Sequence, residues 1–513
     1  MPVGLQPAPK DSALKTGPSS PAQTDRRDLA LLVLLAAAAI LVHGYHPFIE
    51  DAEIYAPGIE KLLNPSLFPF NDAFFTSHAR LTLFPNLIAA TVRLTRLPLE
   101  WALLAWHFAC LYCMLLACWK LARLCFGATR AAWGSTVLLA CLLTIPVAGT
   151  ALYIMDQYVN PRSFFAASAL WIILKTIERK YWTAALWVGL TGLVHPLMAA
   201  FSLAFATALV VTRRMERLFP EVALVAIPLG LFPPVTSAYR QVLDSHSYFF
   251  PLRWAWYEWL GAIAPLAILW WFGEVARYRR LAALKTLGRA TVLFTAGFIF
   301  AGLAITIPPQ FMRFAELQPM RCLQLTYMLL ALISGGLLAE FALGAKLWRW
   351  VALFLPLCSG MFYAQRQLFP ATAHLELPGR RSGNAWLQAF EWIRTNTPSD
   401  AYFALDPDHM RLPGEDQHGF RAIARRSMLA DRVKDSGAVT MFPALASQWL
   451  EQVNAQQNWK RFAADDFQRL HQTFGVTWVV LQAPGPGGMD CPYRNASLLV
   501  CRLATQREYA ESQ

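Results

Sequence analysis

The chain has 513 residues, of which 56% are apolar and only 15% are charged, and its mean hydropathy is +0.35. Soluble proteins carry nearer a quarter of charged residues, so this composition excludes an ordinary soluble enzyme. The net charge of +12 does not indicate nucleic-acid binding, because Lys and Arg occur mostly in short loops between long apolar runs. The sequence therefore predicts a polytopic α-helical membrane protein.

The N-terminal residues 1–27 are rich in Pro, Ser and basic side chains, which is typical of a disordered cytoplasmic tail. The apolar run 28–45 follows and predicts the first span. It lacks an A-x-A site and comes after a long polar tail, so we do not expect a cleavable signal peptide. The basic tail places the next loop on the outer side of a plasma or inner membrane.

This first outer loop, residues 43–80, holds a large share of the acids of the chain, namely Glu50, Asp51, Glu53, Glu60 and Asp72. Acids beside a membrane are costly unless they are hydrated, paired or bound to a cation. Several prolines divide the loop into turns and short helices. A simple solvated loop is one interpretation. We favour a functional site, because the loop is long and the rest of the chain converges on its side of the membrane.

Further apolar runs bring the predicted number of spans to about eleven. They lie near residues 99–119, 132–152, 164–177, 181–194, 197–212, 219–237, 256–273, 290–307, 321–343 and 347–364. The run 81–97 is short, contains Pro85 and ends in Arg93 and Arg96, so we expect a helix lying against the outer face instead. An odd number of spans places the C-terminal portion outside. No internal repeat is evident, which weakens a transporter built from duplicated halves.

The composition changes after the last span. Residues 28–365 form the predicted membrane domain, and residues 366–513 resemble a soluble extracytoplasmic (periplasmic) domain. Amphipathic helical patterns alternate there with strand patterns such as VTWVVLQAP, which predicts an α/β fold. Cys491 and Cys501 flank a short segment of this domain, and outside the cell they could form a disulfide across a hairpin. The remaining cysteines lie in or beside apolar runs, and we expect no structural metal.

Charged residues at the outer ends of spans are the next candidates, because a membrane makes them expensive. They are Asp156, Arg162, His195, Arg313 and Arg321. Asp156 and Arg162 could simply pair across a turn, His195 could cap a helix, and Arg321 could extend toward the lipid headgroups. Arginines in a recess would also bind a phosphate ester through charge-assisted hydrogen bonds. Aromatic and charged residues of the 238–258 loop suit a membrane interface or a sugar- or lipid-binding surface.

This layout resembles the GT-C class of integral-membrane glycosyltransferases. The resemblance depends on the acidic Glu50-Asp51-Ala52-Glu53 motif after the first span, the outer helix that follows it, Asp156 before the fourth span, and the C-terminal α/β domain. WIRTNTPSDAYF and the later FGVTWVVL are similar to outer domains of several such bacterial proteins. The resemblance to the GT-C class implies transfer of a sugar from a polyprenyl-phosphate or polyprenyl-diphosphate carrier to an acceptor at the outer surface.

The resemblance also implies roles for single residues. Asp51, with Glu53 as its neighbour, corresponds to the acid that acts as general base or as part of a metal site; no second Asp-x-Asp is plain, so Mg²⁺ or Mn²⁺ is a possible cofactor rather than an expected one. His195, Arg313 and Arg321 would hold the carrier phosphate, and Asp156 and Arg162 would form another wall. A transporter or flippase of a lipid-linked or polar substrate, and a non-catalytic membrane scaffold, remain as alternatives. The resemblance is to the class as a whole and specifies no particular sugar, carrier or acceptor.

Overall fold

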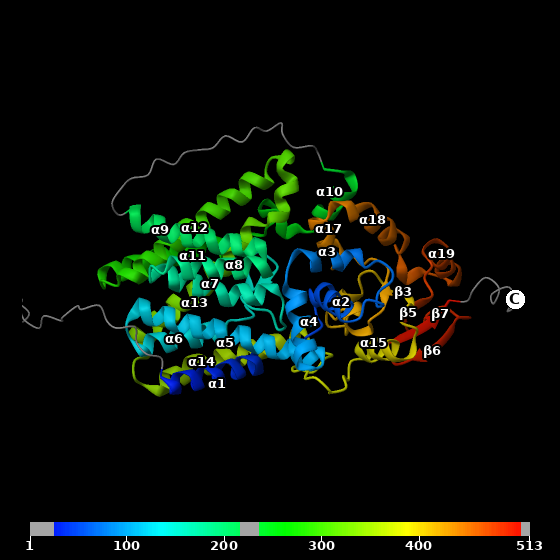
Figure 1. The fold of residues 1–513 in the computed structure, drawn as a ribbon, viewed down its shortest axis with the longest axis horizontal. Helices are drawn as coiled ribbons and strands as arrows, with labels where there is room; N and C mark the ends of the chain where they lie inside the picture. Colours follow the sequence, from blue (N-terminus) through cyan, green and yellow to red (C-terminus); the bar gives the residue numbers. More distant parts are fainter. Residues whose placement is uncertain (1–24, 216–234, 504–513) are drawn as a thin grey trace, which may run out of the picture.

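The computed structural model describes residues 25–215 and 235–503, and it is mostly helical. Figure 1 shows an elongated molecule with a bundle of long helices at one end and a mixed helix–sheet region at the other. The bundle contains α1 (Arg26–His43), α5 (Leu99–Phe126), α6 (Thr129–Cys141), α7 (Pro161–Ile177), α8 (Tyr181–Val194), α9 (Pro196–Met215), α11 (Trp256–Tyr278), α12 (Ala282–Thr306), α13 (Cys322–Leu338) and α14 (Leu347–Leu368).

Six helical segments in the described part of the chain are long and apolar enough to cross a membrane. They are Leu99–Phe126, Pro196–Arg214, Trp256–Tyr278, Ala282–Thr306, Pro309–Leu343 and Leu347–Leu368. The other bundle helices are shorter or less apolar, although each overlaps a predicted span. The span expected at 219–237 falls outside the described residues except for its last three positions. The total of about eleven spans therefore stays a prediction, as does the tail over residues 1–24.

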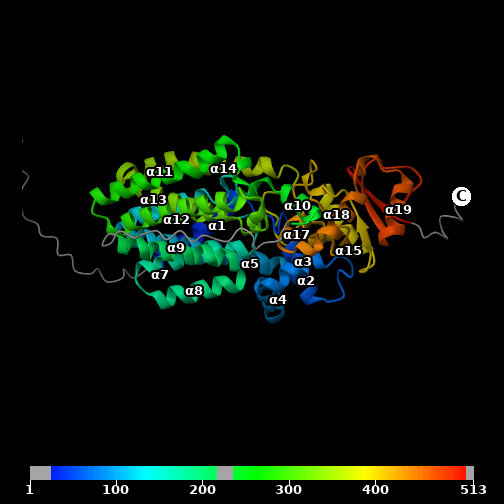
Figure 2. The ribbon, with the colours of Figure 1, turned by 90° about the horizontal axis from the view of Figure 1, so that it is seen from above.

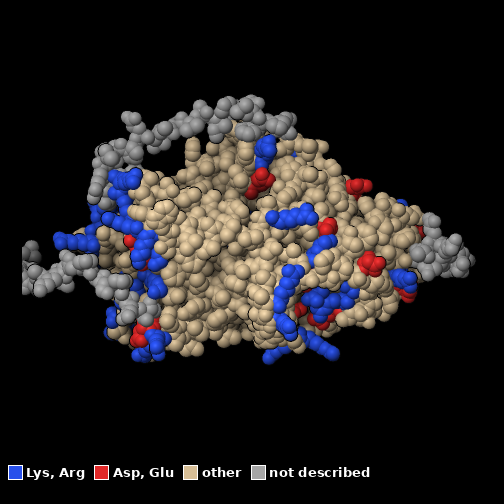
Figure 3. All heavy atoms as spheres, in the orientation of Figure 1, with Lys and Arg blue, Asp and Glu red and all other residues tan. Residues whose placement is uncertain are grey.

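The surface of the bundle supports its insertion in a membrane. Figure 3 shows a broad belt almost without charged side chains, with Lys and Arg gathered at the bundle end far from the mixed region. Basic residues occupy the last turns of the helices that end there, namely Arg123, Lys175, Arg213 and Arg277. Two charged zones separated by an apolar belt are typical of a membrane-spanning protein.

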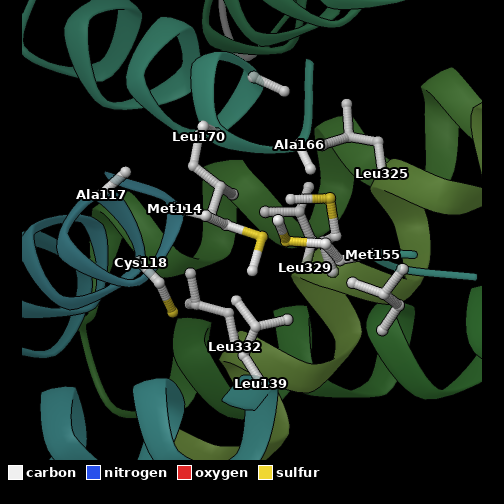
Figure 4. Packing of buried hydrophobic residues seen from close by; sticks show 14 of the residues in the cluster. Met114, Ala117, Cys118, Leu139, Met155, Ala166, Leu170, Leu325, Leu329 and Leu332 are labelled. Carbon is white, nitrogen blue, oxygen red and sulfur yellow. The ribbon is translucent and has the colours of Figure 1, made fainter. Parts of the chain in front are cut away.

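Tight packing holds the bundle together. Met114, Leu170, Leu329 and their neighbours interdigitate between α5, α7 and α13 (Figure 4). Helices α6 and α13 cross closely at Gly134 and Gly335. A Cβ atom built on Gly134 would lie 2.5 Å from the carbonyl oxygen of Gly335, so only glycine fits at this crossing. Small residues that let two backbones approach closely are a recurrent device of helix packing in membranes.

The first loop folds into three helices, α2 (Ala52–Leu63), α3 (Ala73–Leu81) and α4 (Phe84–Thr95). The helix expected at 81–97 corresponds to α4, which has Pro85 in its first turn and ends before Arg96, a residue with positive φ. In Figures 1 and 2 these helices lie at the end of the bundle beside the mixed region. The short hairpin β1 (Pro146–Val147) and β2 (Leu152–Tyr153) lies between α6 and α7.

The C-terminal region contains a five-stranded sheet of order β4-β3-β5-β7-β6. Its strands are β3 (Tyr402–Ala404), β4 (Ser427–Met428), β5 (Trp478–Gln482), β6 (Asp490–Arg494) and β7 (Leu498–Arg502). β3, β4 and β5 are parallel, and β7 and β6 add antiparallel strands. Helices α15 (Ala385–Asn396), α16 (Phe420–Ala424), α17 (Asp435–Met441), α18 (Ala446–Ala455) and α19 (Ala464–Phe474) surround it, and α10 (Ser237–Asp244) packs against α17 and α18.

Cys491 and Cys501 form a disulfide between the neighbouring strands β6 and β7. Their Cα atoms are 3.9 Å apart, closer than the spacing of about 4.4–6.8 Å expected for most disulfides. The bridge closes the antiparallel edge of the sheet and is the pairing that the sequence indicated.

Candidate functional site

A cavity of about 1230 Å³ lies where the bundle meets the C-terminal region. Its walls come from segments far apart in the sequence: Glu50 and Asp51 of the first loop, the hairpin 146–153, Asp156 to Arg162, the 245–261 segment, Arg321, and residues 410–417 and 432–436. Pockets for small molecules typically measure roughly 300–1,000 Å³, so this cavity is large enough for a drug-sized molecule or for two smaller ones.

Asp51 is the acid at the centre of the site. It precedes α2, and its backbone N–H donates to the Tyr158 hydroxyl at 3.1 Å. Its Oδ2 accepts from Arg162 Nη1 at 2.6 Å and its Oδ1 accepts from Lys434 Nζ at 3.0 Å. Burial disfavours the charged carboxylate, but the two cations outweigh burial and hold the pKa of Asp51 well below its usual value. Asp51 is therefore ionised at neutral pH.

Arg162 links this carboxylate to a second one. Asn160 caps α7 by accepting from the backbone N–H of Ser163 at 3.1 Å, and Pro161 occupies the first turn. Because α7 begins at Pro161, Arg162 lies in its first turn, at the cavity. Its Nη2 donates to Asp156 Oδ2 at 2.9 Å. The two residues thus pair, as one interpretation of the sequence held, and Arg162 also bridges Asp156 to Asp51.

Arg321 differs from the other cations of the cavity wall. Arg162, Arg253, Arg411, Arg432 and Lys434 each form an ion pair with a carboxylate. The Arg321 guanidinium forms neither an ion pair nor a hydrogen bond with any residue that the structure describes, and its Nε is buried without a partner. An unpaired, partly buried guanidinium needs an anion or water, so Arg321 is the best candidate for an anion ligand.

Three of the expected site residues do not line the cavity. Glu53 is fully buried and binds the C-terminal region instead. Arg313 is exposed, with its guanidinium 5.7 Å from the Phe314 ring. His195 follows the last residue of α8 and is near enough to Arg321 for electrostatic interaction, but it is not among the lining residues of the cavity. The structure thus brings together Asp51, Asp156, Arg162 and Arg321 in one cavity.

The structure adds residues that the sequence did not single out, above all Lys434. Lys434 lies in a segment with the composition of a soluble domain. Its partners Glu50 and Asp51 are 384 and 383 positions away, so no local pattern indicates the pairing. His246, Tyr248 and Arg253 also line the cavity. They belong to the 238–258 loop, whose aromatic and charged composition was the available signal.

The lining of the cavity also includes apolar side chains. Among them are Val147, Leu152, Trp254 and Tyr257, and Tyr257 in the first turn of α11 is also 62% exposed. Trp254 lies so close to Gly149 that a Cβ atom there would be 2.4 Å from the indole. A cavity lined by both charged and apolar side chains suits an amphipathic ligand.

The residues present do not fit a resident divalent cation. Asp51 and Asp156 share Arg162, and Lys434 occupies the other oxygen of Asp51. Glu53, the other candidate ligand, does not line the cavity and is bound to Arg421. Within residues 25–215 and 235–503, no group of three or more His, Cys, Asp or Glu side chains is arranged to hold a metal ion. At Asp51, a cation such as Mg²⁺ would have to displace an ion pair from either carboxylate oxygen.

Comparisons with known proteins do not assign the chain to a family. No family model matches it, and no curated protein is significantly similar to it. The function is therefore argued from the cavity.

Proposed function

We propose that this protein is a membrane glycosyltransferase of the GT-C type. In this proposal it moves a sugar from a polyprenyl-phosphate-type carrier to an acceptor on the side of the membrane where the C-terminal region lies. The N-terminus is then cytoplasmic, and the C-terminal region is extracytoplasmic. This orientation agrees with the basic residues at the far end of the bundle, because positively charged loops stay inside.

The observation that carries the proposal is the presence of Asp51 and the unpaired Arg321 in one cavity at the edge of the apolar belt. A lipid-linked phosphate sugar has an anion at the level of the headgroups and a chain in the membrane. Arg321 offers the donors for the phosphate, and in this proposal the chain leaves the cavity past the exposed Tyr257. A carboxylate beside them suits activation of a hydroxyl or amine acceptor.

The reaction follows from these positions. The acceptor attacks the anomeric carbon, its proton passes to Asp51, and the bond between that carbon and the phosphate oxygen breaks. Arg321 and Arg162 stabilise the negative charge on the departing phosphate. In the free protein Asp51 is held by two cations and is a weak base. Binding of the phosphate anion gives those cations a competing partner, which raises the basicity of Asp51 when the donor is in place.

A transfer assay tests the proposal. The protein is reconstituted in proteoliposomes with a panel of radiolabelled polyprenyl-phosphate sugars, and labelled products that are no longer extracted with the carrier are counted. We expect Arg321→Gln to reduce transfer at least about a hundredfold, since it removes a charge contact to the leaving group. Arg313→Gln is the matched control, because Arg313 is an exposed arginine of the preceding segment. Movement of the donor across the bilayer without transfer would indicate a flippase instead.

A further inference from the structure

Asp51 and Glu53 belong to one short motif but face different partners. Asp51 faces the cavity, whereas Glu53 is buried against α16. Residues two positions apart on a helix do not share a face, so the separation follows from the geometry of α2. The Glu53 carboxylate accepts from the backbone N–H groups of Arg421 and Ala422, at 3.0 and 3.1 Å. It thereby caps the first turn of α16, where a negative charge is favourable.

Arg421 extends this contact into the C-terminal region. Its side chain is 1% exposed, and it forms a two-point ion pair with Asp435, with Nη1–Oδ1 and Nη2–Oδ2 distances of 2.9 and 2.7 Å. Nη1 also lies 3.4 Å from Glu53 Oε1. Buried charges are costly unless they are matched by geometry of this kind, and losing one partner leaves the others uncompensated.

Asp435 begins α17 and directly follows Lys434. The backbone of this turn is fixed by Asp431, whose Oδ1 accepts from the N–H groups of Val433, Lys434 and Asp435 at 2.7, 2.5 and 3.1 Å. The Lys434 side chain then reaches back to Asp51 and Glu50. The contacts form a closed circuit from Asp51 through Lys434, Asp435 and Arg421 to Glu53, two residues from where it began.

We infer that Glu53, Arg421 and Asp435 form a clamp that positions Lys434 at Asp51, so that the C-terminal region supplies a fixed cation to the cavity. The clamp residues act through Lys434 and are positioning residues, since none of the three lines the cavity. Any role of Lys434 in sugar transfer rests on the proposed function. The position of Lys434 beside Asp51 does not rest on it, and this position can be tested in the protein without substrate.

The first test is the reactivity of the Lys434 amine. The purified protein is treated with a lysine-acylating reagent at pH 8.5, and modification at each lysine is followed by mass spectrometry. We expect Lys434 to react at least about tenfold more slowly than the exposed Lys460, because its partners keep the amine protonated. Equal rates for Lys434 and Lys460 in the unmodified protein would overturn the inference, whatever the variants do.

The second test disturbs the clamp without removing a charge. In Gly419→Ala the new Cβ atom would lie 2.3 Å from Glu53 Oε2, so the carboxylate must move. We expect the reactivity of Lys434 to rise about tenfold, which corresponds to a loss of one pKa unit of stabilisation. Gly437→Ala is the matched control, because a Cβ atom added to Gly437 in α17 would have no other atom within 4 Å among the described residues. Lys61, which pairs with Asp72, should keep its rate in both variants and report on folding.

The third test uses Asp435→Asn, which keeps the size of the side chain and removes its charge. An increase at Lys434 with an unchanged rate at Lys61 supports the clamp. Unchanged Lys434 reactivity in both Asp435→Asn and Gly419→Ala overturns it. General acceleration at Lys61 would identify an unfolded variant, and the decision then returns to the comparison of Lys434 with Lys460 in the unmodified protein.

Activity separates this inference from the proposed function. If the clamp acts through Lys434, Gly419→Ala should add no further loss of transfer in a Lys434→Met background. Additive losses would indicate a general structural role and contradict the inference. A protein with a protected Lys434 but no transfer from any donor would keep the clamp and reject the glycosyltransferase proposal.

Discussion

Lys434 Nζ lies 3.0 Å from Asp51 Oδ1, although 383 positions separate the two residues in the chain. The contact joins the acidic first loop to the C-terminal region and leaves Asp51 between two cations, Lys434 and Arg162. A carboxylate in this setting stays charged down to low pH, so its environment, as well as its presence, determines what it can do as a base.

Replacing Lys434 should change the pH dependence of transfer. Lys434 and Arg162 hold the pKa of Asp51 well below the ordinary value of 3.8. Because the base must be deprotonated in the donor complex, activity is lost as the pH falls through the pKa that Asp51 has in that complex. In Lys434→Met one cation is gone, the pKa of Asp51 rises, and the acidic limb of the rate profile should move up by about one pH unit or more. An unchanged limb would exclude Asp51 as the group that titrates.

The disulfide between Cys491 and Cys501 should contribute measurably to stability. The two cysteines are 10 positions apart, and closing a loop of that size removes conformational freedom worth about 2–3 kcal/mol from the unfolded chain. The double variant Cys491→Ser/Cys501→Ser should therefore unfold at lower denaturant concentration. Reductant should destabilise the unmodified protein by the same amount and leave the double variant unchanged; equal sensitivity of both would contradict the bridge.

The Glu376 carboxylate contacts two buried histidines, His46 of the first loop and His418 of the C-terminal region, and makes the stability depend on pH. Glu376 Oε1 lies 3.0 Å from His418 Nε2 and 2.6 Å from His46 Nδ1. Burial lowers the pKa of His418, but Glu376 outweighs burial and raises it to about 9. The stabilisation is complete below the unfolded value of 6.5 and is lost as the pH rises through about 9.

Glu376→Gln should remove most of this stabilisation, which is on the order of 3 kcal/mol, since Glu415 contributes the rest. The pKa of Glu376 is lowered to about 2, so its own contribution is present above 4.5 and lost as the pH falls. The difference in thermal midpoint between the unmodified protein and the variant should be largest near pH 5 to 6.5 and shrink toward pH 9. Glu451→Gln, an exposed glutamate, is the control. A difference that is constant with pH would reject the pairing.

Local patterns predicted much of the fold. Apolar runs that end in basic clusters indicated the bundle helices, and Arg123 and Arg213 do lie in last turns. The short run 81–97 was distinguished from the predicted spans because it contains Pro85 and ends in Arg93 and Arg96. This run contains α4. The strands β5 and β7 were also recognisable, because continuous apolar residues with β-branched members are typical of buried strands.

The site was predictable only in part. Asp51 stood out as an acid of the long first loop, and Arg162 and Arg321 stood out because charges at the ends of apolar runs are unusual; all three line the cavity. Glu53 was grouped with Asp51 by adjacency, whereas the turn of α2 sends it to Arg421. The role of Lys434 could not be predicted from the sequence, because it depends on a contact with Asp51, 383 positions away, that no local pattern indicates.

The measurement that tests the account most directly is sugar transfer by Asp51→Asn in proteoliposomes, with the unmodified protein and Asp72→Asn assayed beside it. Asp72 lies in the same loop, pairs with Lys61 and is 39% exposed, so it represents an acid of the loop without a place in the cavity. The account predicts that Asp51→Asn lowers the rate about 10²–10⁴-fold while Asp72→Asn stays near full activity. Near-full activity of Asp51→Asn, or a lack of transfer by the unmodified protein from every donor of the panel, would contradict it.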